Sequence, residues 1–68
     1  MRIFLNGSEY PLDHPITVTQ LLQRLDLACK RVAVELNLDI LPRSQHADTR
    51  LADGDRIEIV QAIGGGAD

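Results

Sequence analysis

Hydrophobic and polar residues alternate in three stretches of the chain, residues 1–6, 31–36 and 56–63. Alternation with a period of two is typical of a β-strand that buries one face and exposes the other. In the last stretch Ile57 and Ile59 share the inward face, while Glu58 and Val60 should point outward. We therefore expect three half-buried strands, each with an aliphatic inner face.

Two shorter strands are expected beside these. Asn6-Gly7 directly follows the first strand, and Asn-Gly is the preferred pair for a type I′ hairpin turn because both positions need positive φ. Residues 9–12 should therefore pair back on the first strand, and Pro11 places them at a sheet edge, where its missing N–H costs no ladder bond. Asn37 can take a left-handed turn conformation, and residues 39–41 form a short strand at most.

One helix is expected between the second and third strands. Thr17 followed by Gln20 three residues later has the pattern of a capping box. The apolar residues that follow have helical spacing, so one face of the helix is apolar: Val18, Leu21, Leu22 and Leu25. The helix should end near Asp26, and residues 42–50 are polar and irregular, with one helical turn around 44–46.

The order strand, strand, helix, strand, short strand, strand predicts an α+β fold of the β-grasp or ubiquitin-like type. In this arrangement a mixed sheet of four to five strands wraps around one helix, with the first and last strands parallel in its centre. Residues 1–63 form the expected domain, and residues 64–68 form a flexible glycine-rich tail that leaves the central last strand.

The composition of the chain argues against several classes of function. The chain has 68 residues, a formal net charge of −3 and few aromatic residues (3%), which argues against a nucleic-acid partner. Its single cysteine, Cys29, excludes an internal disulfide and a four-thiolate zinc site, and favours the cytoplasm. No signal-peptide pattern and no apolar run of membrane-spanning length is present, so we expect no membrane association.

No catalytic set is recognisable in the sequence, so we do not expect an enzyme. His14 and His46 are far apart and are expected to be surface residues. Cys29 next to Lys30 is either a reactive thiol or, as we expect, a half-buried filler between helix and strand. Asp53-Gly54-Asp55 has the composition of a turn, so no metal site is expected.

The three glycines at 64–66 allow two interpretations. Glycine is costly to order, so the segment is either a mobile chain end or a strip of bare backbone that enters a narrow slot in another protein. Extended backbone from Ala62 to Gly66 would span roughly 17 Å, at about 3.4 Å per residue, which is enough to reach a buried site. A carboxylate exposed at such a glycine would need activation, for example by transfer to a nucleotide phosphate.

Taken together, several blocks of the sequence resemble the ThiS family, the ubiquitin-like sulfur carriers of thiamine biosynthesis. The likeness covers essentially the whole chain. It includes Met-Arg-Ile-Phe-Leu-Asn-Gly at 1–7, Thr-Val-Thr-Gln-Leu-Leu at 17–22, Val-Ala-Val-Glu-Leu-Asn at 32–37, Leu-Pro-Arg-Ser-Gln at 41–45 and Asp-Gly-Asp-Arg-Ile-Glu-Ile-Val-Gln-Ala-Ile-Gly-Gly-Gly at 53–66. The last block, aligned with the others, is the most specific.

The resemblance implies a sulfur carrier that binds no cofactor of its own. A ThiF-type adenylating enzyme would use ATP to adenylate Gly66, with Gly64 and Gly65 as its narrow neighbours. Sulfur from a cysteine-desulfurase relay would convert the adenylate to a thiocarboxylate, which would donate sulfur to thiazole synthase. The sequence departs from the family pattern in that Ala67 and Asp68 follow the glycines. Either a peptidase removes these two residues first, as we expect, or they are an artificial addition to the chain, or this copy is inactive as a carrier.

The partner-binding surface is expected on the sheet face away from the helix. Phe4, Ala33 and Val60 should form a small apolar patch there, with Ala62 beside it. Two alternatives remain: the sulfur carrier that forms the small subunit of molybdopterin synthase, which also ends in Gly-Gly, and a non-covalent β-grasp binding module.

Overall fold

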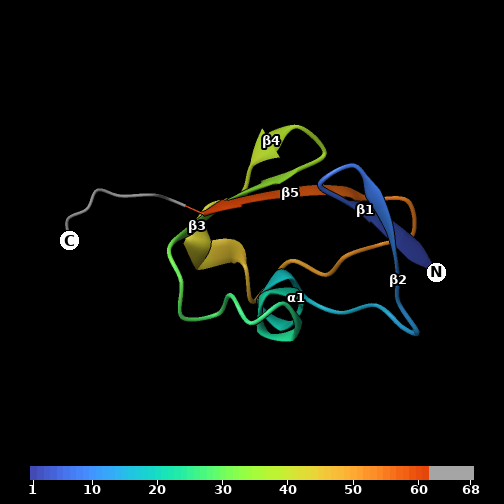
Figure 1. Cartoon of the computed structure of the whole chain (residues 1–68), viewed down its shortest axis with the longest axis horizontal. Helices are drawn as coiled ribbons and strands as arrows, with labels where there is room; N and C mark the ends of the chain where they lie inside the picture. The colour runs from blue at the N-terminus through green and yellow to red at the C-terminus, as the bar shows by residue number, and fades with distance from the viewer. Residues whose placement is uncertain (62–68) are drawn as a thin grey trace.

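A computed structural model of the chain describes residues 1–61 (Figure 1). The elements follow one another in the expected order: β1 (Arg2–Leu5), β2 (Ser8–Pro11), α1 (Val18–Arg24), β3 (Val32–Leu36), β4 (Asp39–Ile40), the 3₁₀ turn η1 (Arg43–Gln45) and β5 (Arg56–Gln61). The domain boundary expected after residue 63 and the tail at 64–68 lie outside the described residues.

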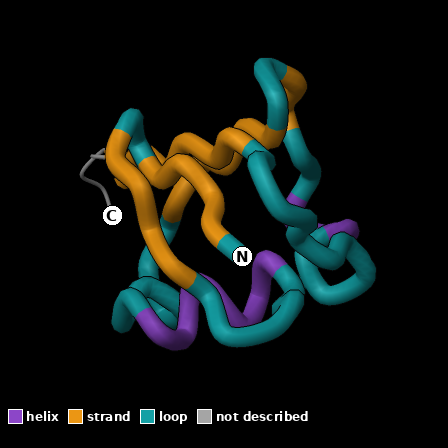
Figure 2. Tube along the Cα trace, turned by 90° about the vertical axis from the view of Figure 1, so that its right-hand side faces the viewer, coloured by secondary structure: helices purple, strands orange, loops and turns teal. Residues whose placement is uncertain are grey.

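The strands form one mixed sheet in the order β2-β1-β5-β3-β4. β1 and β5 are parallel, and the other pairs, β1–β2, β3–β5 and β3–β4, are antiparallel. Both helical segments lie on the same side of the curved sheet (Figure 2). The structure thus confirms the β-grasp arrangement, with the first and last strands adjacent in the centre.

Helix α1 begins with the predicted capping box. The Gln20 N–H donates to Thr17 Oγ1 (3.1 Å), and the Thr17 N–H donates to Gln20 Oε1 (2.8 Å), so two N–H groups at the helix start are satisfied. The helix is short, and its C-cap is Leu25. It ends there because Asp26 takes a left-handed conformation with φ of 61°.

The core lies between α1 and the inner face of the sheet. Its residues are aliphatic, and every element contributes except β2, β4 and η1: Ile3, Leu12, Ile16, Val18, Leu21, Leu22, Val34, Leu51, Ile57 and Ile59. Tyr10 on β2 packs against this cluster from the edge. The inward residues predicted from alternation in the three long strands are therefore confirmed.

The turns agree with the sequence, with one exception. Asn6 and Gly7 both have positive φ (51° and 86°), as a type I′ hairpin turn requires. In the β3–β4 turn, Asn37 is left-handed as predicted, but Leu38 is too, with φ of 75° and its side chain 80% exposed. A branched side chain rarely adopts this conformation, so the backbone is strained at the tip of this hairpin.

Candidate functional site

Strand β5 is the last described element before the three glycines in the sequence. It is hydrogen-bonded to β1 on one side and to β3 on the other, and its pairing with β3 runs to the last described residue, where Val32 lies opposite Gln61. Ile57 is completely buried and Ile59 is 8% exposed, so two aliphatic side chains anchor the strand in the core. The chain therefore reaches residue 61 as an ordered central strand.

Two asparagine side chains hydrogen-bond to β5 where its neighbouring strands turn away. On the β1 side, the Ile59 N–H donates to Asn6 Oδ1 (2.9 Å), and Asn6 Nδ2 donates to the Ile59 carbonyl (3.4 Å). On the β3 side, the Arg56 N–H donates to Asn37 Oδ1 (2.9 Å). Each asparagine side chain thus takes the place of a strand residue as the hydrogen-bond partner of β5. Asn6 does so at Ile59, two residues before Gln61.

In the sequence, Asn6 and Asn37 are recognisable only as turn residues. Their hydrogen bonds to β5 depend on which strand lies next to each turn, and short-range sequence patterns do not predict that neighbour. The asparagines are well suited to these bonds because they tolerate positive φ and carry both a donor and an acceptor. Both have φ of 51°.

Of the proposed docking residues, Phe4, Ala33 and Val60 lie on the outer face of the sheet, but they do not form one continuous patch. Ala33 lies opposite Val60, which is 62% exposed, whereas Phe4 lies opposite Arg56. Arg56 and Val60 are four residues apart on β5, or about 13 Å at the usual strand rise. The outer face therefore carries two apolar spots with Glu58 between them, and Ala62 lies outside the described residues.

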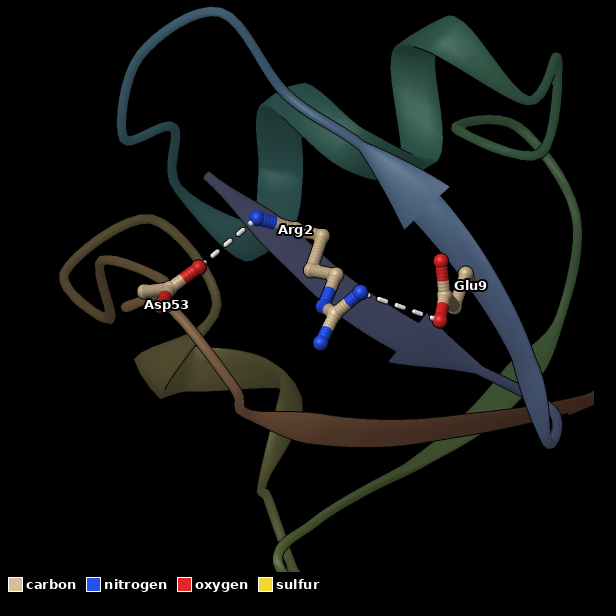
Figure 3. Close-up of polar contacts among 3 residues, drawn as sticks. All are labelled: Arg2, Glu9 and Asp53. Atoms are coloured by element: carbon tan, nitrogen blue, oxygen red, sulfur yellow. Dashed lines mark hydrogen bonds and ion pairs between the residues drawn. The ribbon is translucent and has the colours of Figure 1, made fainter.

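Around Phe4 the outer face is polar, and the charged side chains there contact one another. The Arg2 guanidinium carbon lies 5.8 Å from the centre of the Phe4 ring, and Arg2 Nη1 contacts Glu9 Oε2 at 3.1 Å. Figure 3 shows that the backbone of the same arginine also holds the loop before β5, because the Arg2 N–H donates to Asp53 Oδ1 (2.8 Å). A shallow hollow of about 350 Å³ beside Phe4 is lined by Gly7, Arg56 and Glu58.

The prediction for the histidines is half right. His14 is exposed, as expected. His46 was expected at the surface, but it is buried, with only 6% of the residue exposed. Its ring packs under the η1 turn, and Nε2 donates to the Leu41 carbonyl (3.2 Å). A histidine in a polar stretch was expected to face water, and the packing of that stretch onto α1 buried it instead.

Cys29 is exposed, so the expectation of a half-buried filler is wrong. In the loop after α1, Leu27 is the residue that packs against the core, whereas Ala28, Cys29 and Lys30 are exposed.

The two aspartates act as turn residues, as predicted. Asp53 accepts from Arg2, and Asp55 Oδ2 accepts from the Ala52 N–H (2.8 Å). Within residues 1–61, no three histidine, cysteine, aspartate or glutamate side chains gather in a way that could hold a metal ion. In the same range, no helix is both long and apolar enough to cross a membrane.

Comparison with known proteins agrees with this fold. The model of the ThiS family matches residues 3–66, nearly the whole chain.

The chain belongs to the ThiS family.

Similar proteins include two with informative names. The sulfur carrier protein ThiS of Escherichia coli is 36% identical over 66 residues, which cover 97% of this chain and 100% of that protein. A thiazole synthase of Paramagnetospirillum magneticum is 44% identical over 68 residues, all of this chain. This chain spans only 21% of the length of that thiazole synthase.

A solved structure supports the same family membership. The crystal structure of the thiamine biosynthesis protein ThiS from Geobacter metallireducens superposes with a TM-score of 0.83 and is 36% identical. The match covers 97% of this chain and 100% of the other, so the five-stranded sheet and its helix are shared as a whole.

Proposed function

We propose that this chain is a sulfur carrier of thiamine biosynthesis and that Gly66 holds the group that carries sulfur. The observation that supports this most directly is the position of β5. It is the central strand, it is paired on both sides, and it leads into three consecutive glycines. A rigid domain that ends in backbone without side chains can present a carboxyl group to the closed active site of another protein.

The proposed chemistry has three steps. The Gly66 carboxylate attacks the α-phosphate of ATP in an adenylating enzyme, which forms the acyl-adenylate and releases pyrophosphate. The terminal sulfur of a persulfide on the cysteine-desulfurase relay then attacks the acyl carbon and AMP leaves, which gives an acyl disulfide. A second thiol attacks the relay's sulfur in that disulfide, forms a disulfide with it and releases the thiocarboxylate. The chain is a substrate in all three steps and binds no cofactor itself, and the proposed setting is the cytoplasm.

The residues after Gly66 impose a condition on this chemistry. In the sequence, Gly66 is joined to Ala67, so its carbonyl belongs to a peptide bond and not to a carboxylate. An amide is not adenylated in this way. We therefore propose that hydrolysis between Gly66 and Ala67 precedes activation.

The proposed recipient of the sulfur is thiazole synthase. A protein with that name contains a segment that is 44% identical to the whole of this chain. Its existence supports a working link between this domain and thiazole synthase.

Mass spectrometry of the intact chain tests the proposal. A chain that ends at Gly66 is incubated with a ThiF-type adenylating enzyme and ATP, and we expect the mass of the adenylate. Addition of the sulfur relay should exchange one oxygen for sulfur. The matched control is the same chain with Ala67 and Asp68 attached, which should stay unmodified. A chain ending at Gly66 that gains neither mass would refute the proposal.

The docking role of the outer sheet face is tested separately. Phe4→Asp should leave folding intact, because Phe4 points away from the core, and should weaken binding to the adenylating enzyme. Leu38→Asp is the matched control, since Leu38 is an exposed apolar residue at the tip of the β3–β4 hairpin. Unchanged binding of the Phe4 variant would remove Phe4 from the docking surface.

A further inference from the structure

Two adjoining hollows lie between helix α1 and the η1 turn. Their volumes are about 30 Å³ and about 150 Å³. Arg43 and His46 line both of them, against apolar walls from Leu22 and Ala28. Lys30 lines the smaller hollow only.

The hollows are basic although the protein is acidic. The chain has ten acidic and seven basic residues, yet among residues 1–61 no aspartate or glutamate lines either hollow. In the same range the one ion pair joins Arg2 to Glu9, so neither Arg43 nor Lys30 has a carboxylate partner there. Both side chains are exposed, so two accessible cations border a recess with apolar walls.

The turn that carries Arg43 is held firmly on both sides. His46 is the buried polar side chain of this region, and its Nε2 donates to the carbonyl of Leu41, just beyond β4 (3.2 Å). A carbonyl oxygen only accepts, so Nε2 must carry the proton. The His46 carbonyl accepts from the Thr19 N–H of α1 (3.3 Å), and the His46 N–H donates to the Arg43 carbonyl (3.1 Å). Burial of His46 therefore fixes the backbone that presents Arg43.

The hollows lie beside the last described residues of β5. Val32 lines the smaller hollow, and Val32 is the residue opposite Gln61 at the end of β5. In Figure 1 the η1 turn lies directly under this end of the sheet. Because Gly66 follows Gln61 by five residues, an enzyme that takes up Gly66 would approach near this surface.

We propose that Arg43 and Lys30 form a recognition site for an aspartate or glutamate side chain of the adenylating enzyme. The proposal rests on the function proposed above. A guanidinium group matches the two oxygens of a carboxylate, and Lys30 adds a second positive charge at the recess. Charges at the edge of an interface mainly accelerate association and orient the partners, so this contact would align the glycine segment with the entrance of the enzyme's active site.

The test compares rates of adenylation at limiting enzyme, using chains that end at Gly66. Arg43→Glu should slow loading by roughly tenfold at low ionic strength, and the difference should shrink as salt is added. Lys30→Glu should act in the same direction. Arg50→Glu is the matched control: the charge change is the same and Arg50 is exposed, but it lines neither hollow. Thermal melting confirms that each variant is folded.

The outcomes separate this inference from the proposed function. If the unsubstituted chain is never adenylated, the function itself fails. If that chain is adenylated and Arg43→Glu is loaded at the same rate, only the recognition site is overturned. Equal slowing of the Arg43 and Arg50 variants would show a general effect of net charge and would also overturn the site.

Discussion

The two hydrogen bonds between Asn6 and Ile59 make a sharp prediction about the end of β5. Asn6→Gly keeps the positive φ of the turn, because glycine adopts it freely, and removes both bonds. A hydrogen bond contributes about 0.5–1.5 kcal/mol net, and the longer of these two, at 3.4 Å, is the weaker. We therefore expect the free energy of unfolding to fall by about 1–2 kcal/mol.

This loss should be visible in two measurements. A domain of this size loses about 4–8 °C of melting temperature per kcal/mol, so Asn6→Gly should melt roughly 5–15 °C lower. Amide hydrogen exchange reports the local effect, because the Ile59 N–H loses its acceptor, and its protection should fall about 5–30-fold. Asn6→Ala should be worse than Asn6→Gly, since alanine also resists the left-handed conformation.

Asn37→Gly is the matched control. It removes the corresponding bond to the Arg56 N–H at the opposite end of β5. Its stability loss should be similar, but the amide that loses protection from hydrogen exchange should be that of Arg56. The Ile59 amide should stay protected. If Ile59 exchanges equally slowly in the Asn6→Gly variant and in the unsubstituted chain, Asn6 does not hold this part of β5 and the reasoning is wrong.

Three further substitutions test other local features. Leu38→Gly should raise the free energy of unfolding by about 0.5–1 kcal/mol, because glycine relieves the positive φ and creates an Asn-Gly turn. If the variant unfolds at a lower urea concentration with an unchanged dependence on urea, the backbone at Leu38 is not strained. Thr17→Ala should cost about 1 kcal/mol through loss of the cap, and Thr17→Ser should restore most of it; equal melting temperatures would show that the cap contributes nothing. Glu58→Gln should stabilise the sheet by up to about 1 kcal/mol, since Glu58 lies directly opposite Glu35. That gain should shrink in high salt, and a gain independent of salt would point to another cause.

Much of the fold follows from short-range pattern. The period-two alternation predicted the inward faces of β1, β3 and β5, and Asn6-Gly7 predicted the first hairpin. Thr17 and Gln20 located the helix start because a capping box needs only neighbouring residues. The family followed from whole blocks of sequence, which carry more information than any single motif.

What the pattern could not predict depends on contacts between distant segments. His46 is buried because the η1 turn packs onto α1, and the polar residues around it gave the opposite indication. Cys29 is exposed because Leu27, and not Cys29, is the residue of the loop after α1 that packs against the core. Phe4 and Val60 share the outer face, as alternation predicted, but their separation along the sheet depends on the register between β1 and β5.

The basic recess shows the same limit most clearly. Lys30 and Arg43 are thirteen positions apart and belong to different loops, so nothing in their spacing suggests a common site. They border adjoining hollows because β3 pairs with β5 and η1 packs beneath that pair. Local geometry is set by neighbouring residues, whereas the grouping of charges on a surface is set by strand register and packing, which exist only in the folded chain.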